Sequence, residues 1–146
     1  MRSPLDMEPL LLAQLKAAVA TLRPAVHVLA ADDMAEIVEE KQLVPAIYVL
    51  FDGLTPQEAV GPDARVACHW LTVVAVRNQL AKGKGTGGRT EANALLQATY
   101  SALAGWKPST QSKPLELAPA PRGGHSNGFF YLPLAWRTEM VWRAVI

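Results

Sequence analysis

The chain has 146 residues, of which 50% are hydrophobic and 18% are charged. These values are ordinary for a globular protein and predict a single domain over residues 1–146 with room for a real core. The formal net charge of +1 argues against binding to nucleic acid or a membrane through overall charge. The single cysteine, Cys68, excludes an internal disulfide. No apolar run is long enough to cross a bilayer and no signal-peptide pattern is present, so we expect a protein made and kept in a cytoplasm.

The first half of the chain predicts a helix and two strands. Residues 6–22 have apolar side chains at helical spacing and precede Pro24, which favours a helix that ends there. Its expected buried stripe consists of Leu11, Leu12, Leu15, Ala18, Val19 and Leu22. Residues 26–29 predict a short strand with His27 at an edge or on the surface. Residues 45–52 predict a buried strand, and residues 52–64 predict a flexible, exposed loop between two neighbouring antiparallel strands.

An acidic segment separates the first two predicted strands. Asp32 or Asp33 is placed to cap a short helix, and Glu36, Glu39 and Glu40 follow. The segment lacks the glycine and the spaced oxygen ligands of a calcium loop, so it predicts a solvated face.

The most informative stretch runs from Arg65 to Trp106. Residues 65–79 are largely apolar on both alternating faces and rich in β-branched side chains, which predicts a central strand covered on both sides. Cys68 lies in this strand as a small core residue. Residues 80–89 are rich in glycine without apolar side chains and predict a flexible loop. Residues 90–104 then predict an amphipathic helix that Thr90 caps and Gly105 ends.

The glycine-rich loop also invites a functional interpretation. Residues 83–90 match the phosphate-loop pattern G-x-x-x-x-G-K-[ST], except that Arg89 replaces the lysine. A planar guanidinium does not substitute for the compact ammonium at that position, and the loop comes too late in the chain for a typical nucleotide-binding sheet. A small nucleotide-binding or hydrolytic enzyme that uses this loop with Asp52 remains an alternative.

The C-terminal part predicts two strands separated by a loop. Residues 115–118 favour a brief strand, and residues 121–128 predict a second flexible, glycine-rich loop. Residues 129–143 alternate cleanly, with Leu132, Leu134, Trp136, Thr138, Met140 and Trp142 on one face. Arg137, Glu139 and Arg143 lie on the other, where they are expected to form a ladder of charge pairs. This face is predicted to be wet or interfacial.

No catalytic constellation emerges from the sequence. His27, His69 and His125 share neither a helix face nor the spacing of metal ligands. His125, beside Ser126, is the one candidate for a hydrolytic pair, but neither an orienting acid nor an oxyanion donor is identifiable. We predict no catalytic residue, no metal and no cofactor. The elements together predict an α+β fold: a mixed, mainly antiparallel sheet of about five strands flanked by two or three helices.

In the order of these elements and in their residue patterns, the chain resembles the small tail-terminator proteins of long-tailed bacteriophages. These are also called minor tail protein U-like or tail completion proteins. The likeness is carried by residues 45–52, 67–77, 86–92 and 131–142. The resemblance implies a structural virion protein, assembled in the bacterial cytoplasm, that forms a hexameric ring at the head-proximal end of the tail tube. It would stop tube polymerisation and join tail to neck. The family has no catalytic residues to carry over.

The resemblance also implies the partners. They are further copies of the chain, the tail tube protein and a neck or head-completion protein, with DNA only passing through the ring lumen and no membrane. The candidate contacts with neighbouring subunits or the tube are Lys82, Lys84, Arg89, Arg122, His125, Arg137, Glu139 and Arg143. A tube or neck protein of the same machinery is an alternative, as is an unrelated cytoplasmic interaction domain that forms no ring.

Overall fold

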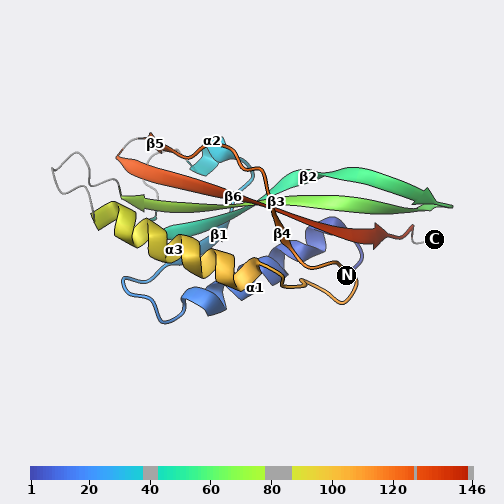
Figure 1. Ribbon diagram of the computed structural model, residues 1–146, viewed down its shortest axis with the longest axis horizontal. Coiled ribbons are helices and arrows are strands. Elements are labelled where there is room, and N and C mark those ends of the chain that lie inside the picture. The colour runs from blue at the N-terminus through green and yellow to red at the C-terminus, as the bar shows by residue number, and fades with distance from the viewer. Residues whose placement is uncertain (38–42, 78–86, 127, 145–146) are drawn as a thin grey trace.

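The computed structural model describes residues 1–37, 43–77, 87–126 and 128–144. The chain begins with the 3-10 helix η1 (Pro4–Asp6) and then forms α1 (Met7–Val19), β1 (His27–Ala30), α2 (Met34–Ile37), β2 (Ala46–Val60), β3 (Asp63–Arg77), α3 (Gly87–Leu103), β4 (Glu116–Ala118), β5 (Gly124–Ser126) and β6 (Phe129–Trp142). Helices α1 and α3 lie on one side of the sheet, and α2 lies on the other (Figure 1).

Within the described residues, the strands form one six-stranded sheet in the order β1-β2-β3-β6-β4, and β5 also pairs with β6. The β1–β2 pair is parallel. All other pairs are antiparallel. The structure thus confirms the predicted α+β class and the mixed, mainly antiparallel sheet.

The predicted central strand is confirmed as β3, which lies between β2 and β6. On its helix-covered face, Val66, Cys68 and Trp70 join a core cluster with α1 and α3. On the other face, Leu71, Val73 and Ala75 pack with residues of β2 and β6 and with Ile37 of α2. Burial on both faces explains why the strand is apolar at almost every position.

Helix α1 buries Leu11, Leu15 and Val19 of its predicted stripe together with Met7, whereas Leu12 and Leu22 are half-buried. Ala18 was expected in that stripe but is exposed, because the helix turns it away from the sheet. In α3, Thr99 is fully buried and donates to the carbonyl of Leu95 at 2.8 Å. Gly105 follows α3 with a φ of 75°, as predicted for a glycine that ends a helix.

The segment 52–64 joins two neighbouring antiparallel strands, as predicted. Its prediction as a loop is wrong, because β2 continues to Val60 and β3 starts at Asp63. The register shifts between Phe51 and Leu54 and between Pro56 and Glu58, so β-bulges absorb the glycine and the proline. The connection shrinks to Gly61 and Pro62, and Gly61 has a φ of 61° that suits a tight hairpin turn.

The other two predicted loops also differ from expectation. Of the loop at residues 80–89, residues 80–86 lie outside the described part, and α3 begins at Gly87. The loop at residues 121–128 contains the short strand β5, which pairs with residues 129–131 of β6. Gly123 allows this approach, because a Cβ there would lie 2.6 Å from the carbonyl oxygen of Tyr131.

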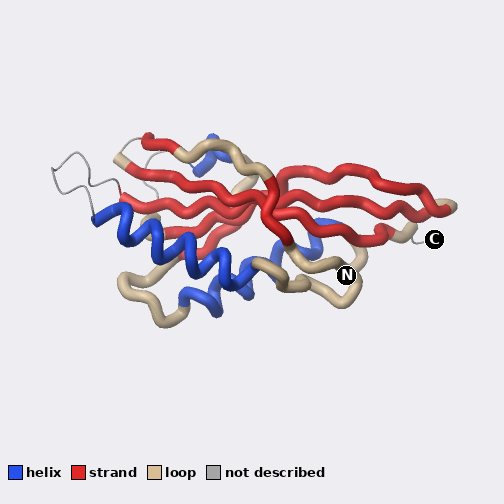
Figure 2. Tube along the Cα trace, in the orientation of Figure 1, coloured by secondary structure: helices blue, strands red, loops and turns tan. Residues whose placement is uncertain are grey.

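Toward the β2–β3 turn, β2, β3 and β6 extend past the helices α2 and α3 (Figures 1 and 2). We call this extension the arm and define it as residues 54–69 of the β2–β3 hairpin with residues 137–142 of β6. The helix-side face of the arm buries Val66, Cys68 and Met140. Side chains near the tip stay open to solvent, with Val60 at 58% and Trp142 at 41% exposed. Both chain ends lie toward this half of the sheet (Figure 1).

Candidate assembly site

The face of the arm that points away from α1 carries a chain of ion pairs across four successive segments. Arg65 of β3 contacts Glu58 of β2 at 3.3 Å and Glu139 of β6 at 3.6 Å. Glu139 also contacts Lys113 at 3.8 Å. We call this row, from Glu58 through Arg65 and Glu139 to Lys113, the charge ladder. Its first residue is the acid Glu58 on β2, and its last is the base Lys113, which lies in the segment beside β6.

A second polar row lies beside the ladder, one step farther from the tip. Thr55 and the Nε2 atom of His69 are 2.9 Å apart, so one of them donates to the other. His69 is paired in register with Arg137, which contacts Glu116 of β4 at 3.4 Å. Arg137 also donates to Glu139 at 3.1 Å and thereby links the two rows. The expected pair of Arg137 and Glu139 is therefore confirmed.

Glu139 is the most enclosed carboxylate of the ladder, with 15% of its side chain exposed. Desolvation by burial raises its pKa. The hydrogen bond from Arg137 and the charges of Lys113, Arg137 and Arg65 lower the pKa by more, so it lies below the ordinary 4.5. The carboxylate is thus held in its charged form by the cations around it.

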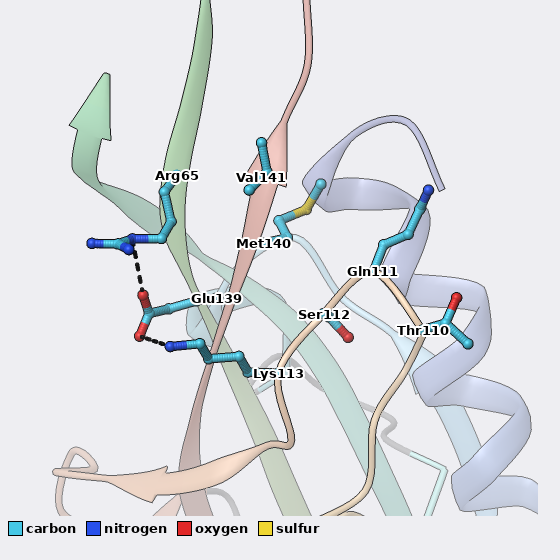
Figure 3. Close-up of a pocket in the computed structure, with 8 residues that line it drawn as sticks. All are labelled: Arg65, Thr110, Gln111, Ser112, Lys113, Glu139, Met140 and Val141. Atoms are coloured by element: carbon cyan, nitrogen blue, oxygen red, sulfur yellow. Dashed lines mark ion pairs between the residues drawn. The ribbon is translucent and has the colours of Figure 1, made fainter. Parts of the chain in front are cut away.

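A cleft of about 250 Å³ lies between the end of β6 and residues 110–113. Figure 3 shows Arg65 and Lys113 reaching Glu139 from two sides, while Gln111 and Ser112 line the cleft from the neighbouring segment. That segment is anchored by the amide of Lys113, which donates to the carbonyl of Glu139 at 2.9 Å. The cleft is open to solvent rather than enclosed, which suits a protein contact better than a small-molecule site.

The β2 edge of the arm is open within the described residues, whereas residues 112–113 lie along the β6 side. β1 pairs only with residues 46–49 of β2, so no described strand lies beside residues 50–60. On the opposite edge, β4 is the last strand of the sheet. Leu117 of β4 is 49% exposed although it lies beside the buried Trp136. Open strand edges with exposed apolar side chains are typical places for pairing with another chain.

The candidate contact residues predicted from the sequence lie in different parts of the structure. Arg137 and Glu139 lie in the polar rows, and Arg143 lies at the tip end, 3.9 Å from Asp63 rather than in the ladder. Arg122 and His125 are exposed near the opposite end of β6, where the His125 ring stacks on Phe130 at 4.5 Å. Lys82, Lys84 and the side chain of Arg89 lie outside the described residues. Their predicted role as contacts stays a prediction.

Sequence reasoning missed Glu58, Arg65, Lys113 and Glu116, which make up most of the ion pairs. Glu58 was assigned to a loop and Lys113 to no helix or strand, so neither had an expected cross-strand partner. Arg65 was placed at the start of the central strand, but its partner on the neighbouring strand was unknown. The usable signal was the spacing between Arg65 and His69, which puts both on one strand face.

Among the described residues, the remaining titratable side chains do not gather into a reactive group. Burial raises the pKa of the Cys68 thiol to about 11. Across the described residues, no three His, Cys, Asp or Glu side chains gather as metal ligands. Asp52, considered above as a partner of a phosphate loop, is exposed at a bulge of β2. His27 is exposed on the edge strand β1, as expected.

Comparison with known families decides the class of the protein. A family model described as phage tail terminator protein matches residues 1–145. The chain belongs to the phage tail terminator family. The resemblance that the sequence suggested is thereby confirmed. No curated protein matches the chain.

Membership of the terminator family makes this protein a structural component of a phage tail, which associates with other tail components in the virion. A structural family also favours a non-enzymatic role. In the described part of this family member, no helix combines the length and apolarity needed to cross a membrane.

Proposed function

We propose that the protein forms a ring, expected to be hexameric, on the head-proximal end of the tail tube. There it stops tube polymerisation and joins the tail to the neck. Its partners are further copies of itself, the tail tube protein and a neck or head-completion protein, and DNA passes through the lumen. The family match over residues 1–145 is the observation that carries this proposal.

The arm supports a self-assembling protein on physical grounds. Val60, Val141 and Trp142 are each more than 40% exposed near the tip, next to open strand edges. Exposed apolar side chains with a polar surround mark interaction surfaces, and aromatic residues anchor many of them. The charged face beside them would add selectivity for the correct partner more than affinity.

The experiment is a tube-growth assay with purified protein. Tail tube protein is allowed to polymerise with and without the terminator-family protein, and tube lengths and ends are examined by electron microscopy. We expect shorter tubes that carry a ring at one end. Tubes of unchanged length with bare ends at every protein concentration would contradict the proposal.

The enzyme alternative is tested separately. Titration with Mg-ATP in a calorimeter is expected to give no saturable heat with the wild type. Saturable binding that disappears in Thr90→Ala would favour a nucleotide-binding function and count against a purely structural role.

A further inference from the structure

We propose that the arm is the joint between successive copies: the open edge of β2 in one copy packs beside β4 of the next, and its Glu58 side chain reaches Lys113 of that copy. The contact at Lys113 is made by side chains, because the backbone of Leu115 is already bonded to Gly105 and Trp106. The contact is head to tail, so each copy uses both of its edges. The inference rests on the proposed self-assembly and specifies which surfaces meet.

The direction of the strands favours this joint. β3 is antiparallel to both β2 and β6, so β2 and β6 run the same way, toward the tip. β4 is antiparallel to β6 and runs away from the tip. Copies related by rotation about an axis along the strands keep these directions, so β2 of one copy meets β4 of the next antiparallel. Antiparallel pairing is slightly more stable per residue than parallel pairing.

One register matches polar side chains at two positions. Placing Glu58 opposite Lys113 also places Thr55 opposite Glu116, since both intervals along the chain are three residues. Lys113 is 66% exposed and Glu58 56% exposed, so each has capacity for a further partner. The neighbour's Glu58 would then continue the charge ladder with the correct sign, acid after base.

The same register covers an apolar side chain on the opposite face. It sets Leu54 opposite Leu117, and both belong to the helix-side face of the sheet. Leu54 is partly buried against the core cluster that contains Trp136, and Leu117 pairs in register with Trp136. A neighbour's Leu54 would shield Leu117, which is 49% exposed in the single chain.

Both edges have an irregular backbone, and the irregular positions face each other in this register. The β2 edge has Pro56 and a shifted register between Pro56 and Glu58. The opposite edge has Pro114, and its register shifts between the Ser112–Met140 bridge and the Glu116–Arg137 pair. Prolines and bulges protect strand edges against indiscriminate pairing, so a partner with a matching irregularity is favoured.

A twofold contact is less suitable for these edges. Two β2 edges in one interface would bring together Asp52 and Glu58 of both copies, and both residues are exposed acids. Like charges placed together across an interface disfavour association. A head-to-tail contact avoids this repulsion and, when its rotation closes, produces a ring.

The decisive experiment is a cysteine pair, Thr55→Cys with Glu116→Cys. Within one chain these positions are separated by three strand spacings, roughly 14 Å, which exceeds the reach of a disulfide at about 7 Å. The native Cys68 is buried. Any disulfide between the introduced cysteines therefore joins two copies and traps even a short-lived contact. We expect a series of multimers on a non-reducing gel that collapses on reduction.

The matched control is Thr55→Cys with Lys113→Cys, which has equally exposed positions but lies out of register. We expect its cross-linked yield to be about tenfold lower, because disulfide geometry tolerates little displacement. An equal yield from both pairs, or no multimers from the first pair at high concentration, would overturn the proposed joint.

Charge reversal gives an independent readout of the same contact. Glu58→Lys and Lys113→Glu should each weaken association by about tenfold, and the double variant should recover most of it. Asp32→Lys, which lies outside the residues of the proposed contact, is the control. Association of the double variant no stronger than that of the singles, while the wild type assembles, would overturn the register. Multimers that cross-link but never close into rings would instead support the joint and contradict the ring.

Discussion

Trp136 of β6 donates its indole N–H to Thr72 Oγ1 of β3 at 3.0 Å in the middle of the sheet. Both side chains are buried, with 0% of Trp136 and 1% of Thr72 exposed. The hydrogen bond satisfies two polar groups that water cannot reach. It also fixes the buried tryptophan of β6 at the point where the arm leaves the helix-covered core.

Replacing Thr72 with valine should destabilise the protein by about 1–3 kcal/mol, because it removes the partner of a buried donor while keeping the volume. The free energy of unfolding in urea measures this loss. Thr110→Val is the control, since Thr110 is exposed, and it should change stability by less than about 0.5 kcal/mol. Equal stability of the two variants would mean that the hydrogen bond contributes nothing.

The sequence predicted the central strand well because both of its faces are buried. Leu71 and Val73 have to pack on one face while Trp70 and Val74 pack on the other, so almost every position is apolar. That pattern is visible without knowing the partner strands. The helices were predicted for a similar reason, since a helix with one buried face shows a clear spacing.

The extension of β2 was missed because its residues suggest a turn. Gly53 and Pro56 normally end a strand, yet here the bulges accommodate both. Residues 55–60 are all exposed, so no apolar alternation marks them as strand. Only the pairing with β3, the strand between β2 and β6, makes this segment part of the sheet.

The ion pairs of the arm were predictable only within one strand. Arg137 and Glu139 are two residues apart on β6, so alternation alone placed them on the same face. Lys113 and Glu58 come from segments far from β6 in the sequence. Their positions depend on the register of β2 with β3 and on the anchoring of residues 112–113 beside β6.

Glu139 should make stability depend on pH. Its pKa in the folded state lies below 4.5, so its contribution to stability is present above that value and is lost as the pH falls through the lower, folded pKa. Glu139→Gln should therefore destabilise the protein near neutral pH, by about 1 kcal/mol at most. The difference from the wild type should shrink as the pH drops below about 4.5.

Urea unfolding of both proteins between pH 7 and pH 3 tests this dependence. Thr110→Val, at an exposed and uncharged position, is the control and should leave the pH dependence of stability unchanged. A constant difference between Glu139→Gln and the wild type across the range would mean that the ion pairs around Glu139 do not stabilise the fold.

Gly123 should not tolerate a larger side chain, whereas its neighbour should. An alanine Cβ at Gly123 would lie 2.6 Å from the carbonyl oxygen of Tyr131, while one at Gly124 would meet nothing within 4 Å. Gly123→Ala should cost about 1–3 kcal/mol, because the segment before β5 has to move away from β6. Gly124→Ala should be nearly neutral. Thermal unfolding of the pair separates the two cases, and equal melting temperatures would contradict the close approach.

Cys68 should be unreactive in the folded protein. Its thiol is buried in the helix-side core, and burial raises its pKa to about 11, so very little thiolate exists at pH 8. A thiol reagent such as 5,5′-dithiobis(2-nitrobenzoic acid) should label the native chain only as fast as the core opens, and should label the urea-unfolded chain within seconds to minutes. Thr110→Cys supplies an exposed thiol that should react at once in the folded state. Rapid labelling of native Cys68 would show that the core under the arm opens easily, which would weaken the case for the arm as a preformed docking surface.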